Sequence, residues 1–202
     1  MSASGVRVGR GIIGLVSAMG AESRAERPAF APWRSAGIGL LRIAFGVVWA
    51  IDAWFKWQPE FVDNFTAYLS SARQDQPAWV QSWIGLWVNV VKVDPVSFAR
   101  LVALAETSIA IALILGIFIN LTSLGGAGLA LMIWSTAEGF GGPYQAGSTD
   151  IGSAVIYALV FAGLFLSQAG LHLGLDRQLT PALGRLGFLA SGPLRFRTPE
   201  VA

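Results

Sequence analysis

The sequence predicts an all-α membrane protein: a four-helix transmembrane bundle with an additional amphipathic interfacial helix between the first two spans. Composition is the first observation behind this prediction, because 54% of the 202 residues are hydrophobic and only 13% are charged. A soluble domain usually carries about 25% charged residues. The second observation is a set of four separate, mostly apolar stretches. Each holds roughly 20 residues, enough for a helix to cross a bilayer.

The expected spans follow one another along the chain with one long interruption. They cover residues 36–57, 98–119, 121–137 and 151–170. The stretch between the first two is too mixed in polarity to be a span. The chain is therefore divided into an N-terminal segment (1–34), a transmembrane domain (35–172) and a basic C-terminal tail (173–202).

Charged residues outside the spans predict the orientation. Arginines flank the bundle on both sides, at Arg7, Arg10, Arg24, Arg27 and Arg34 before it and at Arg177, Arg185, Arg195 and Arg197 after it. Because basic residues stay on the cytoplasmic side, we expect a multi-pass protein of the cytoplasmic (plasma) membrane with both termini in the cytoplasm. The lipid bilayer is then its main partner. A net charge of +2 without a basic run excludes nucleic acid.

The interruption between the first two spans contains the amphipathic segment "WVQSWIGLWVNVV". Trp79, Trp83 and Trp87 recur every four residues and fall on one helical face, and Pro77 suits the first turn of a helix. Indole rings favour the boundary between membrane and water, so we expect a helix lying in that interface. The alternative is an aromatic wall for a flat hydrophobic ligand such as a quinone.

The amino-acid composition excludes several kinds of cofactor, because the chain lacks the residues that would bind them. It has no cysteine and one histidine, His172, which excludes thiolate metal sites, iron–sulfur clusters and haem held by two histidines. No motif for a flavin or a nucleotide is present. We therefore expect no metal, haem or flavin in this chain, and a redox role would use a bound quinone.

Ionisable residues inside the expected spans are the strongest functional signal. The first span carries Arg42, Asp52 and Lys56, and the second carries Arg100 and Glu106. An unpaired charge near the middle of a membrane costs about 2.5–3.5 kcal/mol. Ideal helix geometry puts Asp52 level with Arg100, and brings Arg42 within reach of Glu106. We therefore expect two ion pairs between these helices.

Ionisable residues are rare inside membrane spans and are usually functional, so we assign candidate roles to these residues. Glu106 and Arg42 are the candidate catalytic residues, and the candidate substrate-binding residues are Arg100, Asp52, Lys56 and Tyr157. Tyr157 lies in the fourth span at a depth from which its hydroxyl could donate to Glu106. The alternative is structural, because buried ion pairs also hold helices in register and Tyr157 could serve packing alone.

Three stretches resemble the DoxX/DoxD family of small four-helix membrane proteins. They are "LLRIAFGVVWAIDAWFKWQPEF" in the first span, "LVALAETSIAIALILGIF" in the second and "GGPYQAGSTDIGSAVIYALVF" at the start of the fourth. In that family an arginine opens the first helix, a lysine closes it and a glutamate lies within the second helix. Arg42, Lys56 and Glu106 occupy those positions here. The resemblance covers roughly residues 35–172 and excludes both tails.

The resemblance implies a membrane subunit of a redox complex. DoxD is similar to a subunit of thiosulfate:quinone oxidoreductase, which passes electrons from thiosulfate to quinone. A quinone or a small anion would then bind among the buried charges, with a second redox subunit or another copy of the chain as partner. Two other functions fit the same residues: a non-catalytic membrane scaffold, and a small proton-linked transporter. An aromatic-lined opening beside Glu106 would favour quinone, a continuous polar path would favour transport, and a dry core would favour the scaffold.

Overall fold

The computed structural model describes residues 32–144, 146, 148 and 150–192. The described residues form helices and connecting turns, without a strand among them. The chain divides into two units, Met1–Trp33 and Arg34–Ala202, and the features below belong to the second. The arginines expected to face the cytoplasm before position 32 and after position 192 lie outside the described residues.

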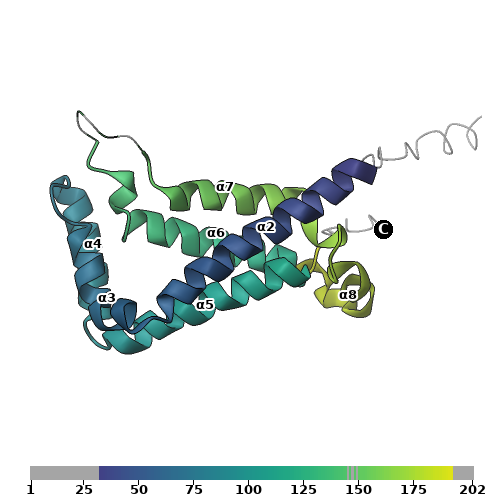
Figure 1. The fold of residues 1–202 in the computed structure, drawn as a ribbon, viewed down its shortest axis with the longest axis horizontal. Helices are drawn as coiled ribbons and strands as arrows, with labels where there is room; N and C mark the ends of the chain where they lie inside the picture. Colours follow the sequence, from purple (N-terminus) through teal and green to yellow (C-terminus); the bar gives the residue numbers. More distant parts are fainter. Residues whose placement is uncertain (1–31, 145, 147, 149, 193–202) are drawn as a thin grey trace, which may run out of the picture. The chain divides into compact units, whose positions relative to one another are not determined.

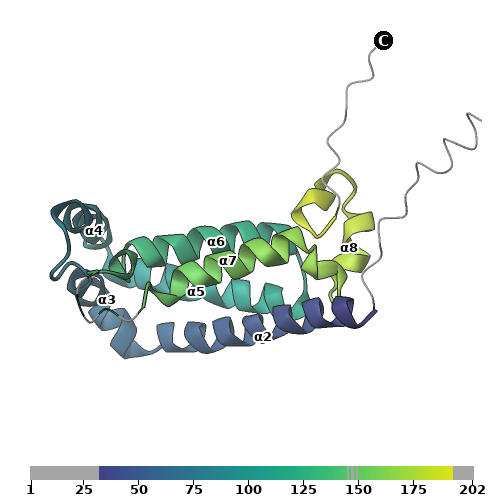
Figure 2. The ribbon, with the colours of Figure 1, turned by 90° about the horizontal axis from the view of Figure 1, so that it is seen from above.

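Four helices run side by side along the second unit (Figures 1 and 2). They are α2 (Pro32–Lys56), α5 (Pro95–Leu115), α6 (Ile119–Ser135) and α7 (Ser153–Leu166). Each overlaps one of the stretches predicted from the sequence, so the all-α prediction is confirmed. Two of them, α2 and α5, are long and apolar enough to cross a membrane, whereas α6 and α7 have 17 and 14 residues.

Helix α5 begins and ends at clear local signals. The Asp94 side chain accepts a hydrogen bond of 3.1 Å from the backbone N–H of Ser97, and Pro95 occupies the first turn. Both residue types favour a helix start. The helix ends at Gly116, whose φ of 69° is left-handed, a conformation that glycine adopts without steric cost. As a result, α5 begins three residues and ends four residues earlier than the stretch 98–119 predicted from the sequence.

The segment between α2 and α5 forms two helices, whereas the sequence predicted one. They are α3 (Pro59–Ser71) and α4 (Ala78–Val91), which lie together at one end of the bundle (Figure 2). Buried Phe65 and Leu69 of α3 pack with Val80, Ile84 and Val88 of α4. The prediction missed α3 because its exposed acidic and polar residues hide a short apolar face.

Aromatic rings join α2 to α7 in the centre of the bundle. Phe45 and Trp49 of α2 contact Tyr157 and Phe161 of α7, with ring centroids 5.0–6.0 Å apart. Gly126 of α6 makes room for this cluster, because a Cβ at that position would overlap the Phe161 ring. Close packing of this kind holds helices together where lipid removes the hydrophobic driving force.

The chain after α7 folds back against the bundle. It forms the short helices η2 (Ala169–Leu171), α8 (Asp176–Ala182) and η3 (Gly184–Leu189) at the end opposite α3 and α4. The sequence predicted a basic C-terminal tail from residue 173, and within this segment Asp176, Ala190 and Ser191 are fully buried. The folded part of the unit therefore continues at least to Gly192.

Candidate functional site

A cavity of about 310 Å³ lies at the α3–α4 end of the bundle. Its wall is mostly aromatic and aliphatic and comes from six helices, α2 to α7. Ligand sites in proteins have volumes of about 300–1,000 Å³ and combine an apolar wall with a few polar groups. The polar part of this wall includes Asp52, Lys56, Glu106, Glu138 and Tyr157.

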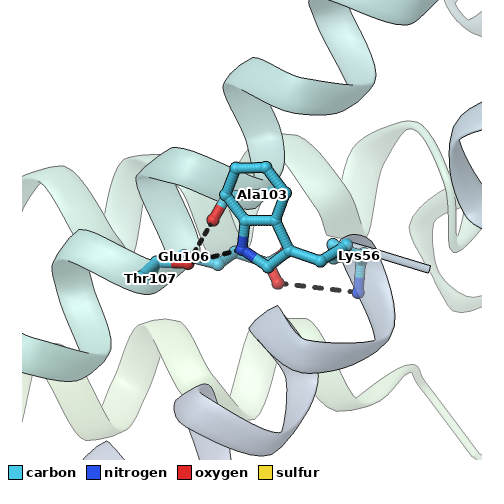
Figure 3. A network of polar contacts seen from close by, with 5 residues as sticks. Lys56, Ala103, Glu106 and Thr107 are labelled. Atoms are coloured by element: carbon cyan, nitrogen blue, oxygen red, sulfur yellow. Dashed lines mark hydrogen bonds and ion pairs between the residues drawn. The ribbon is translucent and has the colours of Figure 1, made fainter.

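Lys56 and Glu106 form an ion pair in this wall. The Lys56 Nζ lies 3.6 Å from Glu106 Oε2, and the two side chains are 21% and 2% exposed. Figure 3 shows the ammonium and the carboxylate pointing toward each other from α2 and α5. The separation exceeds a normal hydrogen bond, and Glu106 Oε2 has no hydrogen-bond partner within the described part of the chain. This oxygen can therefore accept a proton or a hydrogen bond from a ligand.

A second contact holds the end of α2 against α5 beside this pair. The Trp57 indole Nε1 donates to Thr107 Oγ1 at 3.0 Å, and Thr107 Oγ1 donates to the Ala103 carbonyl at 2.7 Å (Figure 3). Trp57 directly follows Lys56, and Thr107 directly follows Glu106. The indole contact therefore fixes the backbone positions from which the ion pair extends.

Two further carboxylates line the cavity. Asp52 lies one turn before Lys56 on α2. Glu138 accepts hydrogen bonds from the Ser153 hydroxyl at 2.9 Å and the Ala154 N–H at 3.1 Å. Those donors begin α7, and the positive end of a helix stabilises a carboxylate there. Sequence reasoning missed Glu138 because its position in a turn gave no signal of contact with α7.

The three tryptophans of α4 do not share one environment. Trp79 is 63% exposed and Trp83 is 37% exposed, whereas Trp87 lines the cavity. The buried face of α4 is instead made by its aliphatic residues, such as Val80 and Ile84. The indoles of Trp79 and Trp83 are therefore exposed and that of Trp87 forms part of the cavity wall. An interfacial position of the exposed indoles stays a prediction.

Arg42 lies at a different place and contacts backbone carbonyls. Its side chain is fully buried. Nη1 donates to the carbonyls of Leu113 and Ile114, and Nη2 donates to those of His172, at 3.3 Å, and Leu173, at 2.8 Å. The last carbonyls of a helix lack partners within the helix and carry its negative dipole. Arg42 therefore caps α5.

The expected pair between Arg42 and Glu106 does not form. Leu113, which accepts from Arg42, lies seven residues after Glu106 on α5, roughly 10 Å along the helix axis. Lys56 takes the position beside Glu106. The prediction was wrong because it assumed straight, level helices and ignored the open carbonyls at the end of α5, which attract a guanidinium strongly. Arg42 also does not line the cavity.

Asp176 completes the structure around the turn from α5 to α6. Its carboxylate accepts from the backbone N–H groups of Phe118, at 2.6 Å, Ile119, at 3.0 Å, and Ser191, at 2.8 Å. A Cβ at Gly116, in the same turn, would come within 2.8 Å of the Arg42 guanidinium. We call Arg42 and Asp176, with the turn Gly116–Phe118 between them, the turn clamp. No pattern around Asp176 in the sequence indicates that this residue is buried.

Arg100 and Asp52, the second expected pair, also stay apart. Among the described residues no ion pair joins them. Arg100 is exposed in the first turns of α5, and it is near enough to Asp94 to help lower the pKa of that carboxyl, after the larger effect of hydrogen bonds from Ser97. The six candidate residues therefore fall into two groups. Four of them, Lys56, Glu106, Asp52 and Tyr157, line one cavity, whereas Arg42 and Arg100 lie outside it.

Among the described residues, no group of three or more histidine, cysteine, aspartate or glutamate side chains could hold a metal ion. Comparisons of the chain with protein-family models, with curated proteins and with solved structures find no significant match. The function is therefore inferred from the cavity and its residues.

Proposed function

We propose that this chain is a four-helix membrane protein that binds a quinone-type ring beside Lys56 and Glu106, as a subunit of a DoxX/DoxD-type redox complex. The observation that carries the proposal is the aromatic-lined cavity of about 310 Å³ with a buried ion pair in its wall. An intramembrane ionisable residue is by default a candidate functional group.

Membrane insertion is supported by the outward faces of the helices. In the most apolar windows of α2 and α5 only 33% of the residues are buried, a smaller share than is typical of the core helices of a soluble protein. Large apolar side chains are exposed on all four long helices, among them Val47, Ile51, Leu104, Ile111, Leu124, Leu131, Ile156 and Leu159. Large exposed apolar surfaces are unusual on soluble monomers. Exposure of the same apolar side chains to lipid is favourable. Helices α6 and α7 are shorter, and in this proposal each crosses the bilayer together with the turns at its ends.

A neutral, flat ligand fits the charge of the cavity better than an anion. One cation, Lys56, faces three carboxylates, those of Asp52, Glu106 and Glu138. Thiosulfate carries two negative charges, and like charges in a poorly hydrated site repel strongly. A quinone has an apolar ring for the aromatic wall and carbonyl oxygens for the polar groups. Tyr157 and Lys56 can donate to such oxygens.

Glu106 has the position of a proton carrier for the ring. Reduction of a quinone to a quinol takes two electrons and two protons. The electrons would come from a partner redox subunit, and Glu106 Oε2, which has no hydrogen-bond partner in the described chain, would exchange a proton with a ring oxygen. Lys56 stabilises the carboxylate form of Glu106 between transfers.

The two other functions have less support. Transport needs a continuous polar path, yet the buried apolar cluster of Phe45, Leu113 and Phe161 fills the bundle beyond the cavity. A pure scaffold would have no use for a cavity of this size beside an ion pair in which Glu106 Oε2 has no hydrogen-bond partner among the described residues.

Quinone extraction tests the proposal. The chain, purified gently from its own membranes, is weighed by native mass spectrometry, and quinone is extracted from the same sample. We expect stoichiometric quinone in the natural chain and its loss in Glu106→Gln. Glu60→Gln is the matched control, because it makes the same chemical change on the exposed surface of α3. Well-folded natural chain without quinone or any partner would refute the redox subunit and leave the scaffold as the next function to test.

A further inference from the structure

Two tryptophans of the cavity have buried N–H groups without partners. The indole Nε1 atoms of Trp49 and Trp87 are shielded from solvent and have no hydrogen-bond partner within the described part of the chain. Both residues line the cavity. Most buried indole N–H groups find an acceptor, so two exceptions in the wall of one cavity call for an explanation.

Neither indole is free to turn toward a different partner. Trp49 is 1% exposed and is held by the rings of Phe45, Tyr157 and Phe161 at 5.4–6.2 Å. Trp87 packs edge to face against Trp83, with ring centroids 5.9 Å apart. The two donors are therefore fixed by packing on different helices, α2 and α4.

The chemistry of the indole limits what can satisfy it. An indole N–H only donates, so its partner must be an acceptor. The cavity also contains one acceptor without a hydrogen bond, Glu106 Oε2. A ligand complementary to this wall offers acceptors to the two tryptophans and, when protonated, a donor to Glu106.

We propose that Trp49 and Trp87 are ligand-binding residues, each donating its indole N–H to an oxygen acceptor of the ring bound in the cavity. This inference rests on the proposed function, and it adds the acceptor pattern that the ligand must have. A 1,4-quinone carries two carbonyl acceptors and no donor. Its reduced form carries two hydroxyl groups, one of which donates to Glu106 Oε2.

Infrared spectroscopy of a bound quinone tests the inference without any substitution. The probe is a short-chain 1,4-benzoquinone labelled with ¹³C at one carbonyl at a time, added to the natural chain in detergent. A hydrogen bond lowers the stretching frequency of a carbonyl. We expect both labelled bands below their frequencies in detergent alone, and bands at the free frequencies would overturn the inference.

Phenylalanine substitutions identify the donors. Trp49→Phe and Trp87→Phe keep an aromatic ring and remove the N–H, so each should raise the Kd of the probe about three- to tenfold and return one carbonyl band toward its free frequency. Trp83→Phe is the matched control, since Trp83 touches Trp87 and does not line the cavity. It should leave Kd and both bands unchanged.

The outcomes separate the inference from the proposed function. A probe that binds the natural chain and is unaffected by both tryptophan variants would overturn the inference and leave the quinone site standing. A probe that does not bind the natural chain at all would overturn both. If a variant fails to fold, bands at the free frequencies in the natural chain would still overturn the inference, because that result needs no variant.

Discussion

Two buried charged centres lie about two helical turns apart along α5, and their polar atoms are satisfied to different degrees. In the turn clamp, Arg42 donates to four carbonyls and Asp176 accepts from three N–H groups. In the cavity, Lys56 and Glu106 face each other at 3.6 Å, and Glu106 Oε2 accepts no hydrogen bond from the described part of the chain. The clamp leaves only Arg42 Nε without a hydrogen-bond partner among the described residues, and a centre satisfied to this degree contributes stability. An incompletely satisfied centre beside a cavity remains available to a ligand.

The comparison predicts its largest effect at Arg42. Arg42→Met should lower the free energy of unfolding by about 3–5 kcal/mol, because it leaves the buried carbonyls and Asp176 without their cation. Equilibrium unfolding of the purified chain in detergent measures this. Arg42→Lys should recover only part of the loss, since one ammonium cannot replace the guanidinium fork. An Arg42→Met chain as stable as the natural one would show that the guanidinium is not structural.

A smaller loss is expected at the other half of the clamp. Asp176→Asn keeps an acceptor oxygen but removes the charge that strengthens its bonds to the N–H groups of Phe118 and Ile119. We expect about 1.5–3 kcal/mol less stability by the same unfolding measurement. Asp150→Asn, at an exposed carboxylate, serves as the control and should change little. If the two substitutions lowered the free energy of unfolding equally, Asp176 would have no special role in stabilising the turn.

The cavity pair should respond in the opposite way. In the double variant Lys56→Met/Glu106→Leu both charges disappear together, so stability should change by less than about 1 kcal/mol or increase. Each single substitution should cost more than the double one, because it leaves a charge without its partner. Quinone binding, measured by extraction, should be lost in the double variant. A large loss of stability with quinone retained would make this pair a structural pin.

The smallest effect is expected at Asp94, which caps α5 outside both centres. Hydrogen bonds from Ser97 lower the pKa of Asp94 below its ordinary value of 3.8. A lowered pKa in the folded chain means that the carboxylate stabilises the fold above that ordinary value, and that this contribution is lost as the pH falls through the folded value. Asp94→Asn should therefore remove a slight acid dependence of the thermal midpoint. An unchanged dependence would mean that Asp94 does not contribute to it.

Most of the fold could be predicted from apolar length alone. The windows located α2, α5, α6 and α7 to within a few residues, because long apolar helices have a strong local signature. Helix α3 could not be predicted in this way, because its apolar face is short and is buried by packing against α4. The fold of residues 173–192 could not be predicted in this way either, because the carboxylate of Asp176 accepts hydrogen bonds from backbone N–H groups 57 and 58 positions earlier.

The sequence indicated most of the residues of the candidate site, but not which of them form ion pairs. Glu106, Lys56, Asp52 and Tyr157 line one cavity, as their rarity in apolar sequence suggested. The pairing of Glu106 was wrong, because ideal helix geometry says nothing about the carbonyls that attract Arg42. Trp49 was not singled out, since an indole in an apolar helix gives no sign that its N–H will lack a partner.

The position of Asp176 also has a consequence for how the chain is made. The backbone N–H groups that begin α6 are synthesised long before the carboxylate that caps them. In the membrane protein proposed above, these groups would be held by water, lipid headgroups or the insertion machinery until residue 176 emerges. Chains released early, between α7 and this aspartate, would carry all four long helices and still lack the contact that closes the α5–α6 turn. We expect such truncated chains to be recognised and degraded by membrane quality control sooner than chains that end after Gly192.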